Sequence, residues 1–184
     1  MRRISRWPDA MSITVRPARA EDVAAIDALL RAGFPAPDEA TLVRDLCMAG
    51  DMVLTLVAQD EEAEALAGTI VFSRMEVTVA GKSVPAVALA PLAVAAPYRR
   101  QGVAEALVRA GHDRLEAEGV VLSFVLGEPD YYARFGYDAA VARNFASPYA
   151  GEYFMALPLQ GGLVPCGVRE DARHAPAFAR LGAA

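Results

Sequence analysis

Apolar positions in the first fifty residues change from an extended to a helical period. Residues 13–16 are a short β-branched run that predicts a strand, and apolar residues then recur at helical spacing over residues 23–30. Gly33 ends that pattern. A second helical pattern begins at Asp38, which is expected to cap it, and closes at Gly50. The chain therefore opens with a strand followed by two helices.

The middle of the chain reads as strands. Residues 52–58 and 66–79 are rich in Val, Leu, Ile and Thr and are separated by a polar connection, which predicts two strands of a meander. Residues 84–94 are apolar almost throughout, as expected for a central strand covered on both faces. Pro91 lies inside that strand and cannot donate to the ladder. We expect the strand to bulge or to part from a neighbour there.

The second half of the chain predicts one long helix and several shorter elements. An amphipathic helix starts near residue 103 and ends at Gly119, and the apolar run that follows it is expected to pair in parallel with the strand before the helix. The remaining predicted elements, in order, are a strand over residues 120–126, a short helix over 131–135, and strands over 137–141 and 153–158.

Composition limits the class of protein. The chain has 184 residues, 54% of them apolar, which suits one domain over residues 12–184, with residues 1–11 as a disordered leader. A net charge of −5 argues against nucleic-acid or anionic-membrane partners, and no apolar run approaches the length of a membrane span or signal peptide. We expect a cytoplasmic protein. Cys47 and Cys166 are too few for a disulfide framework or zinc site, so no metal is expected.

The segment LAVAAPYRRQGVA, residues 92–104, carries the clearest chemistry. An apolar strand runs there into a glycine-containing turn and then a helix, whose first N–H groups have no intrahelical acceptor. Gly102 allows the backbone close to a ligand, and Arg99 and Arg100 add positive charge beside the same N–H groups. A diphosphate would fit such a site. The alternative without a ligand is that the two arginines are solvent-exposed surface residues followed by an ordinary turn.

The full string resembles a family motif. Arg99-x-x-Gly102-x-Ala104, following a strand, is similar to the acetyl-CoA-binding motif of the GNAT superfamily of N-acetyltransferases. The resemblance implies an α/β (α+β) fold, a central mixed β-sheet of about six or seven strands with flanking helices and a splayed pair of parallel strands. The cofactor's pantetheine arm would pair with the strand and its diphosphate would sit on the turn. The residues so implied are Leu92, Ala93 and Val94 for the arm, and Arg99, Arg100, Gln101, Gly102, Val103 and Ala104 for the diphosphate.

A second motif follows at the spacing the family shows. The run PDYYARFGY, residues 129–137, resembles the GNAT segment in which an aromatic pair precedes a Gly-aromatic pair, and the likeness to small bacterial acetyltransferases extends over residues 12–178. By position, Tyr132 is implied to be the general acid that protonates the departing CoA thiolate. Tyr131 is expected to pack along the cofactor. The structural alternative for Tyr132 is a tyrosine of the core or its rim.

The general base is not apparent. Some family members supply a glutamate on the strand before the phosphate turn, but residues 87–94 contain no carboxylate. The amine could lose its proton through water or to a carboxylate elsewhere. We expect His112 on the exposed side of its helix and His174 in a polar tail, and assign neither a catalytic role. The unranked carboxylate candidates are Glu76, Glu128, Asp130 and Glu152.

These observations favour an acetyl-CoA-dependent N-acetyltransferase. An amine of a small molecule or peptide would attack the thioester directly, with the N–H of Val94 polarising the carbonyl. Both cysteines lie outside the motifs, which disfavours an acyl-enzyme. The alternative is a non-catalytic acyl-CoA sensor or interaction module. The absence of GxxxxGK[ST] and GxGxxG runs disfavours a nucleotide-binding domain. The acceptor, the acyl-chain preference and the oligomeric state stay open, although the apolar run 153–158 offers a surface for a homodimer.

Overall fold

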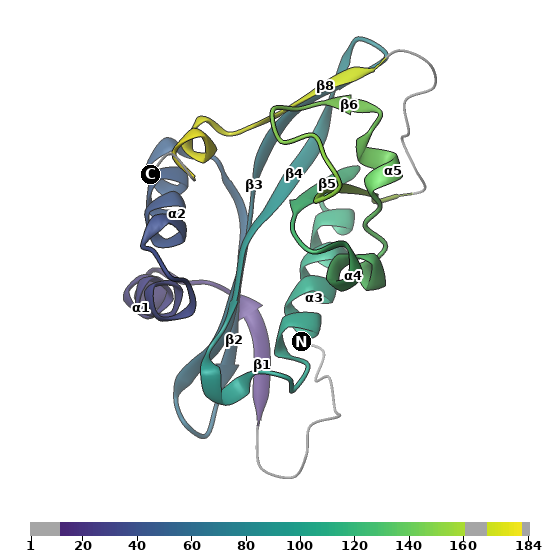
Figure 1. Cartoon of the computed structure of the whole chain (residues 1–184). Coiled ribbons are helices and arrows are strands. Elements are labelled where there is room, and N and C mark those ends of the chain that lie inside the picture. Colours follow the sequence, from purple (N-terminus) through teal and green to yellow (C-terminus); the bar gives the residue numbers. More distant parts are fainter. Residues whose placement is uncertain (1–11, 161–168, 182–184) are drawn as a thin grey trace.

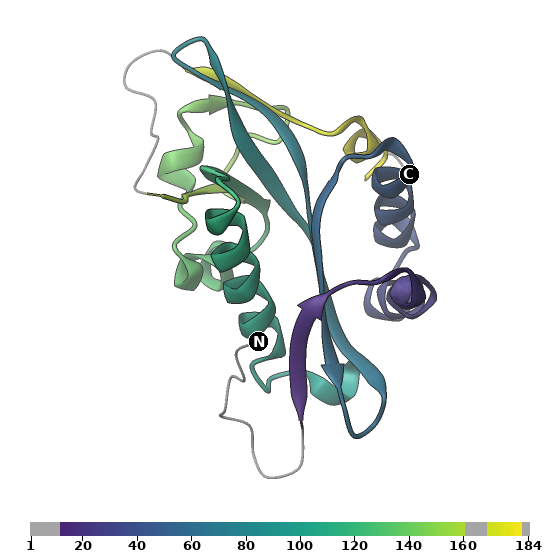
Figure 2. The ribbon, with the colours of Figure 1, turned by 180° about the vertical axis from the view of Figure 1, so that it is seen from behind.

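The structure, a computed structural model, describes residues 12–160 and 169–181. The predicted leader, residues 1–11, and Cys166 lie outside this part of the chain. A long, bent ribbon of two strands, β3 and β4, forms the spine of the molecule (Figure 1). Helices α1 and α2 cover one face of the sheet, and α3 covers the opposite face (Figures 1 and 2).

The sheet has eight strands in the described residues, with a path β1-β2-β3-β4-β5-β7 and with β8 pairing with both β3 and β6. Pairs along the path are antiparallel, except for the parallel pair β4 and β5. This confirms the predicted mixed sheet and its central parallel pair. The strands are β1 (Ile13–Pro17), β2 (Met52–Asp60), β3 (Ala65–Val79), β4 (Lys82–Val94), β5 (Leu122–Leu126), β6 (Phe145–Ala146), β7 (Phe154–Pro158) and β8 (Glu170–His174).

The first two helices end at the glycines that the sequence pattern predicted. They end at Gly33 and at Ala49 before a left-handed Gly50. Asp38 is the first helical residue and not the cap, because Pro37 occupies the N-cap position. The α-helices are α1 (Val23–Gly33), α2 (Asp38–Ala49), α3 (Val103–Ala117), α4 (Pro129–Tyr132) and α5 (Ala139–Ala142). The 3-10 turns are η1 (Ala20–Asp22), η2 (Ala96–Tyr98), η3 (Ala133–Phe135) and η4 (Pro176–Arg180).

One predicted strand is wrong. Residues 137–141 contain the short helix α5 instead, because the Asp138 carboxylate accepts the backbone N–H of Ala140 at 2.7 Å and starts a helical turn in an alanine-rich run. Only Asp138 itself bridges to the sheet, opposite Ala156. The two strands that the sequence pattern missed, β6 and β8, are a two-residue pair and a mostly polar segment, neither of which shows the alternation that identifies a strand.

Two apolar clusters fix the layers on the sheet. Helix α3 packs so closely on β3 that a Cβ at Gly111 would lie 2.5 Å from the ring of Phe72. On the other face, the C-terminal Phe178 packs in a second buried cluster with Phe124 and Phe154. The end of the described chain is therefore held against the middle of the sheet, beside α2 (Figure 1).

Candidate functional site

The parallel strands β4 and β5 part halfway along β4. They pair from Ala86 to Leu89, and no pairing continues beyond that point. Between its pairs at Leu89 and Leu92, β4 carries two residues opposite one residue of β3, so the strand bulges at Ala90 and Pro91. This confirms the expectation that Pro91 makes the strand bulge and leave a neighbour.

The parted strand presents backbone groups to the gap. Ala95 donates its N–H to the carbonyl of Ala67 at 2.9 Å, and bonded and non-bonded positions alternate along an antiparallel pair. The N–H and C=O groups of Ala93 therefore face β3, whereas those of Leu92 and Val94 face the side that β5 has left. An extended, amide-bearing ligand can pair with this open edge.

The start of α3 forms an anion site next to that edge. Gly102 precedes the helix with a φ of 84°, and the first helical bond runs from Ala106 N–H to Gly102 O. The N–H groups of Val103 and Ala104 thus have no intrahelical acceptor, and the helix dipole adds partial positive charge there.

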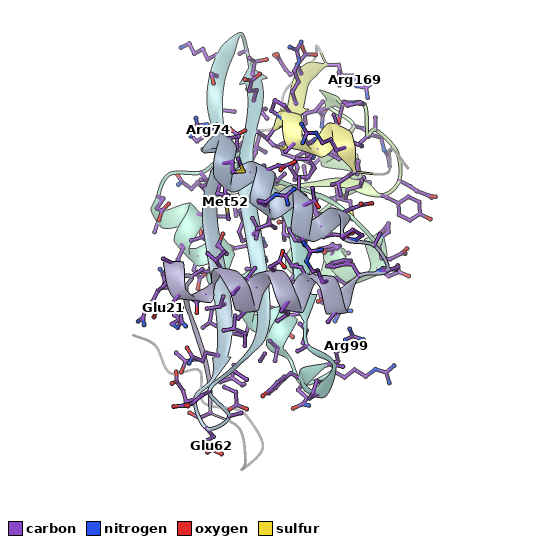
Figure 3. All side chains as sticks on the ribbon, turned by 90° about the vertical axis from the view of Figure 1, so that its left-hand side faces the viewer. Glu21, Met52, Glu62, Arg74, Arg99 and Arg169 are labelled. Atoms are coloured by element: carbon purple, nitrogen blue, oxygen red, sulfur yellow. The ribbon has the colours of Figure 1, made fainter. Side chains whose placement is uncertain are left out.

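The turn before α3 is held by its own side chains. The Arg99 Nε donates to the carbonyl of Val94 at 3.1 Å, and Gln101 donates to the carbonyl of Pro97 at 2.7 Å. Arg99 and Arg100 are exposed, and Arg99 lies at the outer edge of the molecule (Figure 3). Arg100 and the remaining N–H groups of Arg99 can therefore meet an anion at the helix start.

Tyr132 lines a cavity where β4 and β5 separate. Burial raises the pKa of its hydroxyl to about 12, so the group keeps its proton at neutral pH and can donate it. Its ring meets those of Tyr131 and Tyr137 edge to face. A Cβ at Gly127 would lie 2.4 Å from Cε2 of Tyr132, so that glycine allows the ring to take this position.

The two neighbouring tyrosines differ in their surroundings. Tyr131 does not line the cavity, and the guanidinium of Arg134 lies 4.6 Å from the centre of its ring. The structure thus brings Tyr132, and not Tyr131, to the cavity at the strand gap.

The cavity has a volume of about 270 Å³ and an apolar wall. It extends from the bulge of β4 to the connection between α1 and α2 and to the C-terminal segment. Four of its lining residues carry groups able to bind or move a proton, namely Glu39 of α2, Tyr132, Tyr149 and His174 of β8. The Tyr149 hydroxyl already donates to the carbonyl of Phe178. The four carboxylates considered from the sequence, Glu76, Glu128, Asp130 and Glu152, are all exposed and none lines this cavity.

His112 does not lie on the exposed side of α3, so that prediction is wrong. It is half-buried, and its Nε2 lies 3.0 Å from the Tyr137 hydroxyl, which is also bonded to Ser123 at 2.7 Å. Burial lowers the pKa of His112 to about 4 and raises that of the Tyr137 hydroxyl. This neutral network fixes Tyr137, whose ring packs on Tyr132.

His174 does not lie in a polar tail either. It ends β8, paired with Met75 of β3, and its ring centre lies 4.9 Å from that of Tyr149 and 4.8 Å from that of Phe178. Burial lowers the pKa of its imidazole to about 4. No pattern in the sequence indicates this placement, because the aromatic rings around His174 come from separate segments.

Within residues 12–160 and 169–181 there is no group of three or more His, Cys, Asp or Glu side chains that could hold a metal ion. Nor does this part of the chain contain a helix long and apolar enough to cross a membrane.

Known proteins are similar to this chain in both sequence and fold. The model of the acetyltransferase (GNAT) domain matches residues 14–140. The uncharacterized N-acetyltransferase YhbS of Escherichia coli K12 is 41% identical over 130 residues, which are 71% of this chain and 76% of YhbS. The uncharacterized N-acetyltransferase SCO2625 of Streptomyces coelicolor is 38% identical over 117 residues, 61% of this chain and 28% of that protein.

Two similar solved structures contain a bound ligand. The structure of E. coli YhbS in complex with CoA superposes with a TM-score of 0.85 at 34% identity and covers 95% of this chain and 96% of that one. A GNAT family acetyltransferase from Brucella melitensis in complex with acetyl-CoA gives 0.72 at 26% identity, covering 90% and 97%.

Proposed function

The chain belongs to the GNAT family of acetyltransferases, and on that premise we propose that it transfers the acetyl group of acetyl-CoA to a primary amine. The observation that carries the proposal is the meeting of three features at one gap in the sheet. These are the open edge of β4, the anion site at the start of α3, and Tyr132 on the wall of a cavity.

The residues present fit acetyl-CoA. The amides of the pantetheine arm would pair with the backbone groups of Leu92 and with the N–H of Val94, whose carbonyl already accepts from Arg99. The diphosphate would take the N–H groups at the start of α3 and the charge of Arg99 and Arg100. Support comes from YhbS and the Brucella protein, whose structures hold CoA and acetyl-CoA respectively.

The chemistry needs no acyl-enzyme. The amine nitrogen would attack the carbonyl carbon of the thioester, so that a C–N bond forms and the C–S bond breaks. The N–H of Val94 would stabilise the negative charge that develops on the carbonyl oxygen. Tyr132 would give its proton to the leaving thiolate, and the nitrogen would release one proton.

Thiol release from acetyl-CoA with a panel of amines tests the activity. The panel should contain small aromatic and aliphatic amines, polyamines and peptides with free N-termini or lysines. We expect at least one amine to accelerate thiol release and to yield an acetamide by mass spectrometry. CoA binding without transfer to any amine would contradict the enzymatic function and favour an acyl-CoA sensor.

A glycine at each end of α3 offers a matched test of the cofactor site. Gly102→Glu places a carboxylate where the diphosphate should lie, so calorimetry should show loss of CoA binding. Gly119→Glu is the control, because Gly119 has a similar positive φ of 86° and open space around it. Equal CoA affinity in both variants would contradict the placement of the diphosphate.

A further inference from the structure

The cavity beside Tyr132 contains a second group suited to proton transfer. His174 lines the same cavity as Tyr132 but comes from β8, on the far side of the space from α4. The family model ends at residue 140, so β8 and its histidine lie outside the region that it matches. No carboxylate is present on the β4 segment that lines the cavity, which leaves the base of the proposed reaction unassigned.

The ring of His174 is held in place by aromatic neighbours. The rings of Tyr149, Phe154 and Phe178 surround it at centre-to-centre distances of 4.9, 5.9 and 4.8 Å. Tyr149 is itself fixed, since its hydroxyl donates to the carbonyl of Phe178 at 3.1 Å. The imidazole is thus oriented by packing and does not depend on a hydrogen bond for its position.

The two ring nitrogens differ. Nδ1 is buried and has no hydrogen-bond partner, which is unusual for a buried polar atom. A buried Nδ1 leaves Nε2 as the nitrogen for exchange with a bound molecule, and Nε2 has a lone pair in the tautomer whose proton is on Nδ1. Because the surroundings keep the pKa of the imidazole near 4, the ring stays neutral at physiological pH and offers a lone pair.

The cavity wall also carries a charged group, Glu39, whose charge is complementary to that of an amine. Glu39 is the one carboxylate, and no Lys or Arg is present, among the residues that line the cavity. A carboxylate on the wall attracts an amine, whereas the apolar remainder suits a compact hydrocarbon or aromatic substituent. The neutral histidine does not repel an incoming ammonium group.

We propose that His174 is the general base that removes the proton from the acceptor nitrogen while the C–N bond forms. This role rests on the proposed acetyl transfer. An acceptor that arrives as an ammonium group first loses one proton to solvent. The lone pair of the free amine then attacks the thioester carbonyl, the nitrogen becomes acidic as it acquires positive charge, and its proton passes to Nε2 of His174. The C–S electron pair leaves with sulfur and takes the proton of Tyr132. Solvent then removes the proton from His174 and reprotonates Tyr132, so the enzyme is restored.

Two variants separate this role from packing. His174→Phe keeps an aromatic ring among aromatic neighbours and breaks no hydrogen bond, so thermal unfolding should show a folded protein. We expect its kcat with the best amine of the panel to fall about 100-fold, within the range of general-base catalysis, at unchanged CoA affinity. His174→Ala should show a similar loss.

Rescue of kcat by an added base distinguishes a catalytic role from a packing role, because a residue needed only for packing would not be replaced by a base in solution. Imidazole added to His174→Ala should restore kcat at least tenfold, which is part of the roughly 100-fold loss expected when a general base is removed. Pyrazole has the same ring shape but is a far weaker base, and it should restore little.

Wild-type kcat in His174→Phe, or equal rescue by imidazole and pyrazole, would overturn the role while leaving the acetyltransferase function intact. A wild-type protein that acetylates no amine in the panel would contradict both.

Discussion

The two sides of the gap between β4 and β5 are built in different ways. The proposed cofactor side is one continuous segment, residues 92–104, which offers backbone groups and exposed positive charge. The proposed acceptor side is a cavity assembled from α2, β4, β5, α4, β8 and the C-terminal turn, which offers side chains in largely apolar surroundings.

This difference explains why one side can be recognised in a sequence and the other cannot. A backbone site depends on local conformation, which a short string of residues dictates. A side-chain site depends on which distant elements the fold brings together. The same contrast predicts that changes on the cofactor side alter CoA affinity, whereas changes on the acceptor side alter the rate of transfer.

Removing the hydroxyl of Tyr132 should have the largest effect on the rate. Tyr132→Phe keeps the ring packing but removes the acid, so we expect a fall of about 100-fold in the single-turnover rate. CoA affinity in calorimetry should stay at the wild-type value. A wild-type single-turnover rate would exclude Tyr132 as the acid and would weaken the division between the two sides.

Displacing the ring of Tyr132 should cost less. In Gly127→Ala, the new Cβ would lie 2.4 Å from Cε2 of Tyr132, so the ring must move. We expect about a tenfold fall in kcat, since small misplacements of catalytic groups slow the reaction. Gly151→Ala is the matched control, because a Cβ there has open space. Equal kcat in both variants would show that the ring position does not matter.

Single arginine variants should weaken CoA binding modestly. Arg99→Ala and Arg100→Ala each remove one exposed charge, and we expect a loss of about fivefold in CoA affinity, roughly 1 kcal/mol. The loss should shrink at high salt because exposed charges are screened. Arg143→Ala, just after α5, is a control of equal charge. The KM for the amine should not change, and a change there would contradict the separation of the two sides.

The smallest expected effect compares the two buried histidines, only one of which, His174, lines the cavity. Both His112 and His174 have pKa values lowered to about 4 by burial, whereas the unfolded chain titrates near 6.5. The unfolded state therefore binds more protons between these values, and stability should fall as pH drops from about 6.5 to 4. The melting temperature over this range should decline less in His112→Phe and in His174→Phe than in the wild type.

The two variants should differ in their starting stability. His112→Phe loses the bond to Tyr137 and should melt at a lower temperature at pH 7.5. His174→Phe loses no hydrogen bond and should not. Identical pH profiles in both variants and the wild type would mean that neither imidazole titrates on unfolding.

Most of the sheet and the cofactor turn could be predicted because their signals are local. The apolar run of β4, the proline within it and the glycine at the start of α3 each act on their own backbone. His112 was misplaced because its helical face carries charged neighbours, Arg109 and Asp113, and the hydroxyl of Tyr137 that draws it inward lies 25 residues away. Glu39 and His174 line the same cavity only because α2 and the C-terminal segment pack on the same part of the sheet.

The division between the two sides is tested most directly by amide spectra of the uniformly ¹⁵N-labelled protein titrated with CoA. We predict that the largest shifts occur at Leu92 and Val94 on the open strand edge and at Val103 and Ala104 at the helix start. Amides near Glu39 and His174 should move little until an amine is added. Shifts confined to the cavity, with none at the start of α3, would contradict the assignment of the cofactor to that side.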